Sequence, residues 1–438
     1  MTKSLCPAVI VILASSLAAF SQTADIEPTP TPVKVVITNN LPRPRTVPSP
    51  TPRPVVKASD EQDVELSGSD QHTKPSAPIV VGNAGSTGNV PRANTAASAR
   101  VLNFSTIKSK LAEAKRQMQS RPVATTSVES AAGTNWVRIA FHDWKTNAVD
   151  YIVIPKTSFL STTEIKQGVS SNGRNITVQT IRGNGVNTPV IVTDETGQMQ
   201  LPLIVQYPVE KGGRHVETAY YISTHPGLVT PEVVNAGRFY VRNVIEIARD
   251  KLKDKGITIH AKVADIAERL STVEHVDHQR FRNEPHSKIY DDIFTLYALN
   301  EGQTYRYSVS SAGAGGMVQM IPSTYRMVRA RYPQINLMPD FVEGMRDHVN
   351  ATQAMLLYMQ WTWSDLISNP TVANAVASGI ATQEQLMAAG YNSNPARLPG
   401  YINRGGANWT TLIPRETKIY LQIYESIERF VPMTPRSH

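Results

Sequence analysis

The chain has 438 residues, with 44 Lys or Arg against 36 Asp or Glu, which gives a net charge of +8 and a pI near 9.4. This length suits two or three domains. The 30 prolines and the aromatic content of 7% predict long stretches without a packed core. A moderate basic balance suits an anionic polymer, a membrane surface or nucleic acid alike, so charge does not choose the partner. A single cysteine excludes a disulfide within the chain.

The N-terminus has the pattern of a secretory signal. Lys3 precedes an apolar run from Pro7 to Phe20, which has the usual length for a signal and is shorter than the ~20 residues that span a bilayer. The small residue Ser21 predicts cleavage after position 21, so residues 1–21 are a predicted signal peptide and the chain is predicted to be exported. A retained short anchor remains the alternative. Removal of the signal would also remove Cys6, leaving no thiol for catalysis.

Residues 22–98 are predicted to form a disordered linker. The part from Glu27 to Ala58 is rich in Pro, which favours an extended, semi-rigid spacer. The part from Ser59 to Ser98 is rich in Ser, Thr, Gly and Asn and has few aromatic residues. This segment is either a tether towards a partner in the cell envelope or a plain linker.

Residues 99–121 are predicted to form an amphipathic helix. Ile107, Leu111, Ala114 and Met118 recur at helical spacing, with Lys and Glu between them. The apolar face is narrow, which favours docking on a neighbouring domain over lying on a membrane surface.

Residues 134–226 are predicted to form a small antiparallel β domain. Alternating or β-branched runs predict its strands, and Gly212–Gly213 predicts a hairpin between the last two. The predicted strands are Trp136–Phe141, Asp150–Ile154, Asn175–Gln179, Leu203–Tyr207 and Glu217–Ile222. His142 and Asp143 are interpreted as the polar end of a strand, since no further metal-ligand cluster lies near them in the sequence.

Residues 230–432 are predicted to be α-helical. Thr230 is a helix N-cap followed by Pro231. The predicted helices are about 231–255, 262–281, 289–301, 323–332, 340–363, 370–378, 382–389 and 414–430. The predicted fold class is therefore an α+β multidomain protein with an all-α C-terminal part.

The stretch from Asn300 to Tyr325 carries the most chemistry. Glu301 ends a predicted helix, and three glycines follow at Gly313, Gly315 and Gly316. Glycine lets a backbone approach closely, because it has no Cβ. The apolar Met317, Met320 and Ile321 follow, and such neighbours raise a carboxyl pKa by burial. This pattern predicts a carboxylate at the floor of a groove.

Three blocks in this part resemble the soluble lytic transglycosylase family, which has the goose-type lysozyme-like fold. Glu301 stands twelve positions before Gly313, as in the family signature. Matching positions in that block are Ser310, Gly313, Ala314, Gly316, Gln319, Pro322 and Thr324. Gly302 departs from it, since the family has Ser after the glutamate. The other two blocks are Ala388–Arg397 and Leu412–Tyr420, which resemble the family's Tyr-Asn and Glu-Thr-x-x-Tyr blocks.

The resemblance implies an exported enzyme of the periplasm or cell envelope that acts on peptidoglycan glycan strands. Such enzymes cleave the MurNAc-β-1,4-GlcNAc bond without water and leave a 1,6-anhydro product. By the same resemblance Glu301 is acid and then base, while Ser310, Gln319 and the backbone of Met317 bind the sugar. Tyr391 would face Glu301 across the groove, with Asn392 supporting it. The resemblance implies no cofactor, no metal and no nucleic acid.

Alternative interpretations remain open. The chain could be a muramidase on the same fold, releasing reducing ends, or a catalytically inactive wall-binding scaffold. Glu274 is a rival carboxylate: within a helix over 262–281 it would share a face with His278, as a catalytic acid, a metal ligand or a solvated residue. Trp361, Trp363 and Trp409 could stack on sugars, although packing is commoner for Trp. Endo or exo action, the role of the β domain, the partners and the oligomeric state stay undecided.

Overall fold

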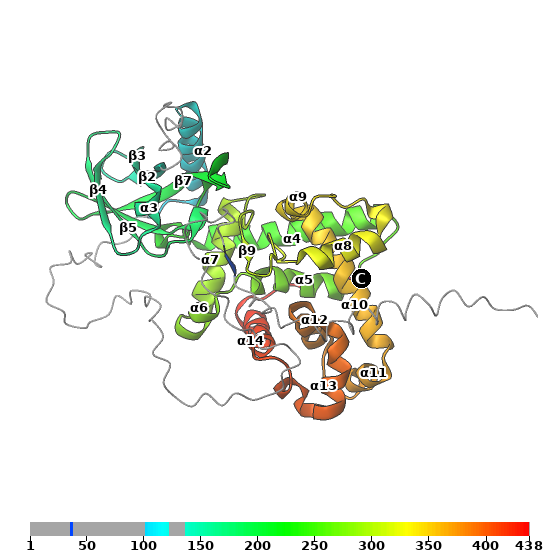
Figure 1. Cartoon of the computed structure of the whole chain (residues 1–438). Coiled ribbons are helices and arrows are strands. Elements are labelled where there is room, and N and C mark those ends of the chain that lie inside the picture. The colour runs from blue at the N-terminus through cyan, green and yellow to red at the C-terminus, as the bar shows by residue number, and fades with distance from the viewer. Residues whose placement is uncertain (1–35, 38–100, 122–135, 438) are drawn as a thin grey trace, which may run out of the picture. The chain divides into compact units, whose positions relative to one another are not determined.

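The computed structural model describes residues 36–37, 101–121 and 136–437, and these belong to one compact unit. The predicted signal peptide and all of the predicted linker except Val36–Ile37 lie outside the described residues. The described part is an α+β fold with thirteen α-helices and a seven-stranded antiparallel sheet (Figure 1). The expected α+β class is confirmed at this level.

The seven-stranded sheet has the order β3-β2-β7-β6-β5-β4, and β8 pairs with β7. The long strand β7 organises it, because it pairs with β2, β6 and β8 along different parts of its length. The strands are β2 (Trp136–Asp143), β3 (Ala148–Pro155), β4 (Ile165–Val169), β5 (Asn175–Thr180), β6 (Val190–Asp194), β7 (Met199–Lys211) and β8 (Arg214–Tyr221). Between β3 and β4 lies the short helix α3 (Lys156–Leu160).

All five predicted strands are present, and β4 and β6 are additional. Residues that alternate along a strand point to opposite faces of the sheet, and in β2 Val137, Ile139 and Phe141 are all buried. Gly212 and Gly213 form the predicted turn of the β7–β8 hairpin. His142 and Asp143 do end strand β2, and both are fully buried.

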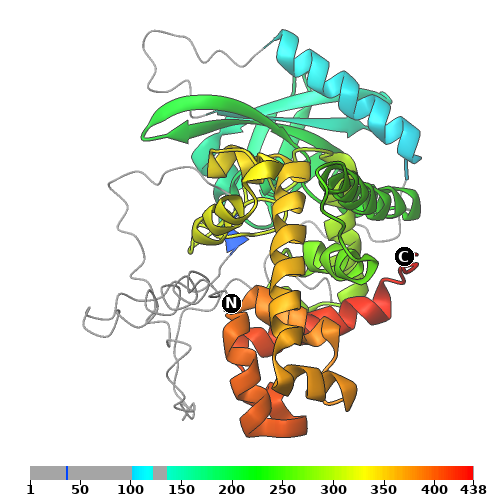
Figure 2. The same ribbon diagram turned by 90° about the vertical axis from the view of Figure 1, so that its right-hand side faces the viewer.

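Helix α2 (Phe104–Ser120) docks on this sheet with the predicted face. Ile107, Leu111, Ala114 and Met118 are its buried residues, and they share an apolar cluster with side chains of β2, β3 and β7. Asn103 caps the helix, since its side chain accepts a hydrogen bond from the Thr106 amide. The docking interpretation is confirmed (Figure 2).

The rest of the described chain is mostly helical. Its longer helices are α4 (Pro231–Asp254), α5 (Ala261–Val273), α7 (His286–Leu299), α8 (Pro322–Arg331), α10 (His348–Ser368), α12 (Gln383–Asn392) and α14 (Arg415–Phe430). The shorter ones are α6 (His278–Asn283), α9 (Phe341–Arg346), α11 (Pro370–Ala377) and α13 (Leu398–Gly405). A two-residue strand, β9 (Val309–Ser310), pairs with β1 (Val36–Ile37).

Two predicted helices are each divided in the structure, and α13 was not predicted. The range 262–281 is split into α5 and α6, because the side chain of Asp277 accepts hydrogen bonds from the amides of Gln279 and Arg280 and so starts a new helix. The range 340–363 is split into α9 and α10, where Asp347 caps the second helix. Glu274 and His278 therefore do not share one helix face.

Packing between α4 and α7 depends on a glycine. A Cβ at Gly237 would lie 1.9 Å from the Phe294 carbonyl oxygen, so only glycine allows this approach. Helix α10 contacts α4 and α5, and α11 to α14 gather near its C-terminal half (Figure 2). One apolar cluster contains buried residues of both the sheet and these helices.

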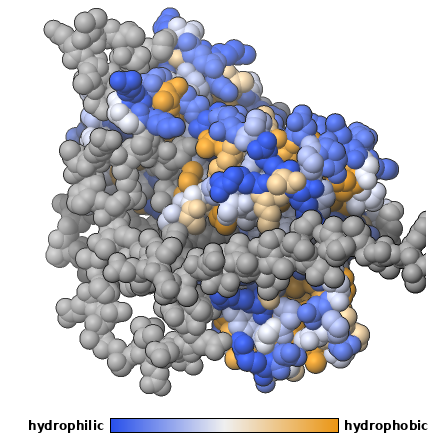
Figure 3. Space-filling model, turned by 45° about the vertical axis from the view of Figure 1, so that its right-hand side comes forward, coloured by the Kyte–Doolittle hydropathy of each residue, from blue (hydrophilic) through white to orange (hydrophobic). Residues whose placement is uncertain are grey.

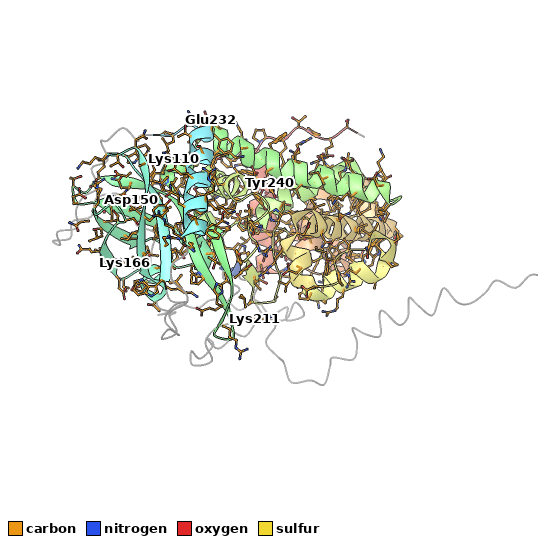
Figure 4. All side chains as sticks on the ribbon, turned by 90° about the horizontal axis from the view of Figure 1, so that it is seen from above. Lys110, Asp150, Lys166, Lys211, Glu232 and Tyr240 are labelled. Carbon is orange, nitrogen blue, oxygen red and sulfur yellow. The ribbon has the colours of Figure 1, made fainter. Side chains whose placement is uncertain are left out.

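The surface is mostly polar, with apolar side chains scattered over the visible face (Figure 3). Lys211 lies at the tip of the β7–β8 hairpin, where it projects from the sheet, while Lys110 lies on α2 (Figure 4). Within the described residues, no helix has the length and apolar character needed to cross a membrane.

Candidate functional site

Glu301 does not lie in an apolar setting, so that expectation is wrong. It follows Asn300, the C-cap of α7, in a turn on the surface. Its side chain is 53% exposed, and its carboxylate lies 3.4 Å from the ammonium of Lys108 on α2. Gly302 and Gln303, which follow it, are also exposed, and its described ion pair is with α2. The structure does not bring Glu301 together with Tyr391 or Gln319.

Glu274 has the setting that was expected of Glu301. It is the C-cap of α5 and is only 4% exposed. The hydroxyl of Tyr420 on α14 donates a hydrogen bond of 2.7 Å to its Oε1. Helix α5 is buried on most of its sides, with Val263, Ile266 and Leu270 in the core. The helix therefore delivers a carboxylate into the interior at its C-terminal end.

The charge of this carboxylate acts on two tyrosines. Burial raises the pKa of Tyr391 and of Tyr420 well above the usual value, and the charge of Glu274 raises both pKa values further. Both phenols therefore stay protonated at neutral pH and can donate hydrogen bonds. Tyr420 donates to Glu274, while Tyr391 donates to the carbonyl of Val318 at 2.7 Å.

The glycine-rich loop is hydrogen-bonded to His275, the residue that follows Glu274. The carbonyl of Met317 accepts a 2.8 Å hydrogen bond from Nε2 of His275. Gly316 has a φ of +68°, and a Cβ there would lie 2.2 Å from the Met345 carbonyl oxygen, so both conformation and space require glycine. The close approach predicted for the glycines is thus observed at Gly316. Met317 is fully buried.

Gln319 and Ser310 are both buried but are held differently. Nε2 of Gln319 donates to the Gly316 carbonyl at 2.9 Å and to Oγ of Ser308 at 3.2 Å. Its Oε1 has no hydrogen-bond partner among the described residues, and its backbone φ is +48°. Oγ of Ser310 accepts from the amide of Ala314 at 3.0 Å and so closes the turn before the loop.

The other two blocks of the resemblance meet in space. The hydroxyl of Thr417 on α14 donates to Oδ1 of Asn392, at the end of α12, at 2.9 Å. Asn392 follows Tyr391, and Thr417 lies one turn before Tyr420 on the same helix. Of the expected site residues, Tyr391 lies within the electrostatic range of Glu274, and Met317 is bonded to its neighbour His275. Asn392 is bonded to Thr417, and Gln319 is bonded to Ser308 and Gly316.

Several residues of this arrangement had no role in the sequence-based prediction. His275 and Thr417 contact the expected site residues directly, and Tyr305 stacks on His275 with ring centroids 3.4 Å apart. The one available signal was the apolar character of α5, which favours burial of the carboxylate at its end. Of the tryptophans considered for sugar stacking, Trp409 packs in the core with 1% exposure, and Trp361 and Trp363 are partly buried.

No group of three or more His, Cys, Asp or Glu side chains within the described residues is placed to bind a metal ion. A cavity of about 190 Å³ lies between α12 and α14, and its lining includes Glu384, Tyr424 and Glu428 but not Glu274. A comparison of the chain with protein-family models, curated proteins and solved structures found no match.

Proposed function

We propose that this protein is a peptidoglycan lytic transglycosylase of lysozyme-like fold, with Glu274 as its acid and base. The observation that carries the proposal is the environment of that carboxylate. It is 4% exposed, it ends a buried helix, and it receives a hydrogen bond from Tyr420 in the last of the three resembling blocks. The other two blocks contribute Tyr391 and the glycine-rich loop beside it.

The proposed reaction has two proton transfers through one carboxyl group. The protonated carboxyl of Glu274 gives its proton to the oxygen of the departing GlcNAc while the bond from that oxygen to C1 of MurNAc breaks. The N-acetyl oxygen of MurNAc assists at C1. The carboxylate then takes the proton of the C6 hydroxyl, whose oxygen bonds to C1 and releases the acetamido oxygen. The products are a 1,6-anhydro-MurNAc end and a free GlcNAc hydroxyl, and no water is consumed.

The glycine-rich loop supplies no second carboxylate, which favours this route over hydrolysis by a pair. Most glycosidases place two carboxyl groups across the bond that they break. The sequence from Gly302 to Pro339, which contains the glycine-rich loop, has no Asp or Glu. Glu274 is the carboxylate whose charge acts on both Tyr391 and Tyr420. A single group that serves as acid and then base fits this composition.

The test compares the same substitution at the two candidate carboxylates. Glu274→Gln removes the proposed acid, so we expect the release of soluble products from purified sacculi to fall by about 10²–10⁴-fold. Glu301→Gln changes an exposed residue, so its rate should stay within about twofold of the wild-type rate. Circular dichroism and thermal unfolding of both variants check the fold. A fully active Glu274→Gln variant beside an inactive Glu301→Gln variant would contradict the assignment.

Mass spectrometry of the products separates the proposed function from its alternatives. Anhydro ends support the transglycosylase. Reducing ends, heavier by one water, would instead identify a muramidase on the same site. Binding to sacculi without soluble product would identify a wall-binding scaffold.

The proposed substrate lies outside the cytoplasm, so the proposal includes export by the predicted signal and a place in the periplasm or cell envelope. Detection of the mature chain beginning near position 22 in an envelope fraction tests this part.

A further inference from the structure

The end of strand β8 is fixed to the segment Asn300–Ser308, called here the connecting turn. Oδ1 of Asn300 accepts a hydrogen bond from the amide of Ile222 at 2.9 Å, and its Nδ2 donates to the carbonyl of Ile222 at 2.8 Å. Asn300 is 4% exposed, so water does not compete for these groups. The side chain thus pairs with the residue that directly follows β8, as a neighbouring strand would.

Two further contacts join β8 to the same turn. The amide of Tyr305 donates to the hydroxyl of Tyr221 at 3.4 Å, a long hydrogen bond in a buried position. A carboxylate oxygen of Glu217 lies 3.5 Å from the guanidinium of Arg306. Tyr305 also has a φ of +59°, a conformation that a non-glycine residue keeps only where its surroundings impose it.

The connecting turn reaches the candidate site at two places. The ring of Tyr305 lies parallel to His275, with an interplanar angle of 1° and centroids 3.4 Å apart, and His275 holds the Met317 carbonyl. The carbonyl of Ser308 accepts from the amide of Gly316 at 3.0 Å, and its Oγ accepts from Gln319. One segment therefore contacts the sheet, the neighbour of Glu274 and the glycine-rich loop.

We propose that the β-sheet is a positioning element for this site, acting from the end of β8 through Asn300 and Tyr305 to His275 and the loop. This inference rests on the proposed function and gives the sheet a role in it. Catalytic groups must be held within about 0.5 Å of their productive geometry, and buried contacts of this kind supply such restraint. Asn300, Tyr305 and His275 are positioning residues in this scheme, while Glu274 is the catalytic residue.

The test uses pairs of variants that differ in one contact. Tyr305→Leu removes the ring that stacks on His275, whereas Tyr305→Phe keeps both the ring and the backbone donor. Tyr221→Phe removes the hydroxyl that accepts from Tyr305. Tyr220→Phe is its control, because the Tyr220 hydroxyl is contacted by Gln206 within the sheet.

Two readouts are measured on the full chain: kinetics on soluble uncross-linked glycan strands, and amide hydrogen exchange of the peptide that contains Met317 to Gln319. Tyr305→Leu should lower kcat by about tenfold or more with KM within about twofold, and should speed exchange in that peptide. Tyr221→Phe should lower kcat by about threefold, as expected for one long hydrogen bond. Tyr305→Phe and Tyr220→Phe should match the wild type in both readouts.

The outcomes separate the two proposals. If the wild-type protein cuts no glycan, the proposed function fails, while faster exchange in Tyr305→Leu and Tyr221→Phe still supports the positioning role. If Tyr305→Leu does not fold, Tyr221→Phe decides. Unchanged exchange and unchanged kcat in Tyr221→Phe and in any folded Tyr305→Leu variant would overturn the positioning role, whatever reaction the wild type catalyses.

Discussion

At the scale of single residues, the contact between Tyr420 and Glu274 determines how the carboxylate is held. A buried carboxylate without hydrogen bonds is costly, and a bond from a neutral donor offsets part of that cost. Tyr420 is 3% exposed and its hydroxyl lies 2.7 Å from Oε1, so the bond is short and shielded from water. It also fixes the direction in which the carboxyl group points.

We expect Tyr420→Phe to lower the free energy of unfolding by about 1–3 kcal/mol, the usual cost of removing one partner of a buried hydrogen bond. It should also slow product release from sacculi, because the carboxyl group loses its orientation. The matched control is Tyr424→Phe on the same helix, whose hydroxyl has no hydrogen-bond partner among the described residues. Urea unfolding and product release are measured for both variants. Equal effects of the two substitutions would contradict a specific role for the Tyr420 hydroxyl.

The site was only partly predictable from the sequence. The close approach of the glycine-rich loop was predicted from its glycines, which lack a Cβ, whereas Tyr391 and Asn392 were implied by the family resemblance. The expectation of a buried carboxylate was placed on Glu301, whereas the buried one of the two is Glu274, which α6 and α7 separate from the loop in the sequence. Spacing along the sequence selects Glu301 as the candidate acid, whereas burial of the side chain selects Glu274. Only packing decides which of two helix ends lies against the loop.

At the scale of elements, helix α2 joins the sheet to the turn that carries Glu301. Its apolar face is buried against the sheet, and its polar side carries Lys108 towards Glu301. The apolar contacts and the ion pair differ in strength. Burial of a large aliphatic side chain stabilises by a few kcal/mol, whereas an exposed ion pair contributes about 0–1 kcal/mol.

We therefore expect adjacent substitutions on α2 to have different effects. Ile107→Ala removes a side chain with 0% exposure and should lower the free energy of unfolding by about 2–5 kcal/mol. Lys108→Ala, its neighbour, should change that free energy by no more than about 1 kcal/mol, because both partners of its ion pair are 53% exposed. Denaturant unfolding of the full chain measures both. An Ile107→Ala variant as stable as Lys108→Ala would show that α2 does not contribute to the folded core.

The elements themselves were largely predictable where one local rule dominates. Alternating or β-branched runs and the Gly212–Gly213 hairpin signal predicted five of the seven sheet strands, and period-3.6 spacing predicted the buried face of α2. Divided helices were missed because Asp277 and Asp347 act as caps inside ranges that are otherwise apolar and periodic. An Asp inside such a range either caps a new helix or lies on the solvated face of a continuous one. The spacing of the apolar residues is the same in both cases.

At the scale of the whole molecule, sheet and helices share one apolar cluster, and buried histidines lie within the fold. His348 on α10 is 5% exposed. Its Nδ1 lies 2.7 Å from the hydroxyl of Tyr240, and its Nε2 lies 2.8 Å from the Thr304 carbonyl in the connecting turn. Since a carbonyl only accepts, Nε2 carries the proton and Nδ1 accepts from Tyr240. The neutral ring thus satisfies both contacts.

This burial makes stability depend on pH. Burial lowers the pKa of His348 from 6.5 to about 4, and it lowers the pKa of His225 to about 4 as well. Because the unfolded chain takes up these protons at a higher pH than the folded chain, acid favours unfolding. The contribution of the neutral rings is complete above pH 6.5 and is lost progressively as the pH falls towards 4. We expect the urea midpoint to decrease over this range.

The decrease should be smaller in His348→Gln, since glutamine cannot take up a proton in this range although its amide can still donate and accept. His215→Gln is the matched replacement at the surface, because His215 lies in the exposed β7–β8 hairpin. Urea midpoints at pH 7.5, 5.5 and 4.5 test these expectations. A wild-type midpoint that stays constant, or an equal pH dependence in His348→Gln and the wild type, would mean that the buried imidazole takes up no proton on unfolding. The hydrogen bond from His348 on α10 to the Thr304 carbonyl of the connecting turn would then not explain a loss of stability in acid.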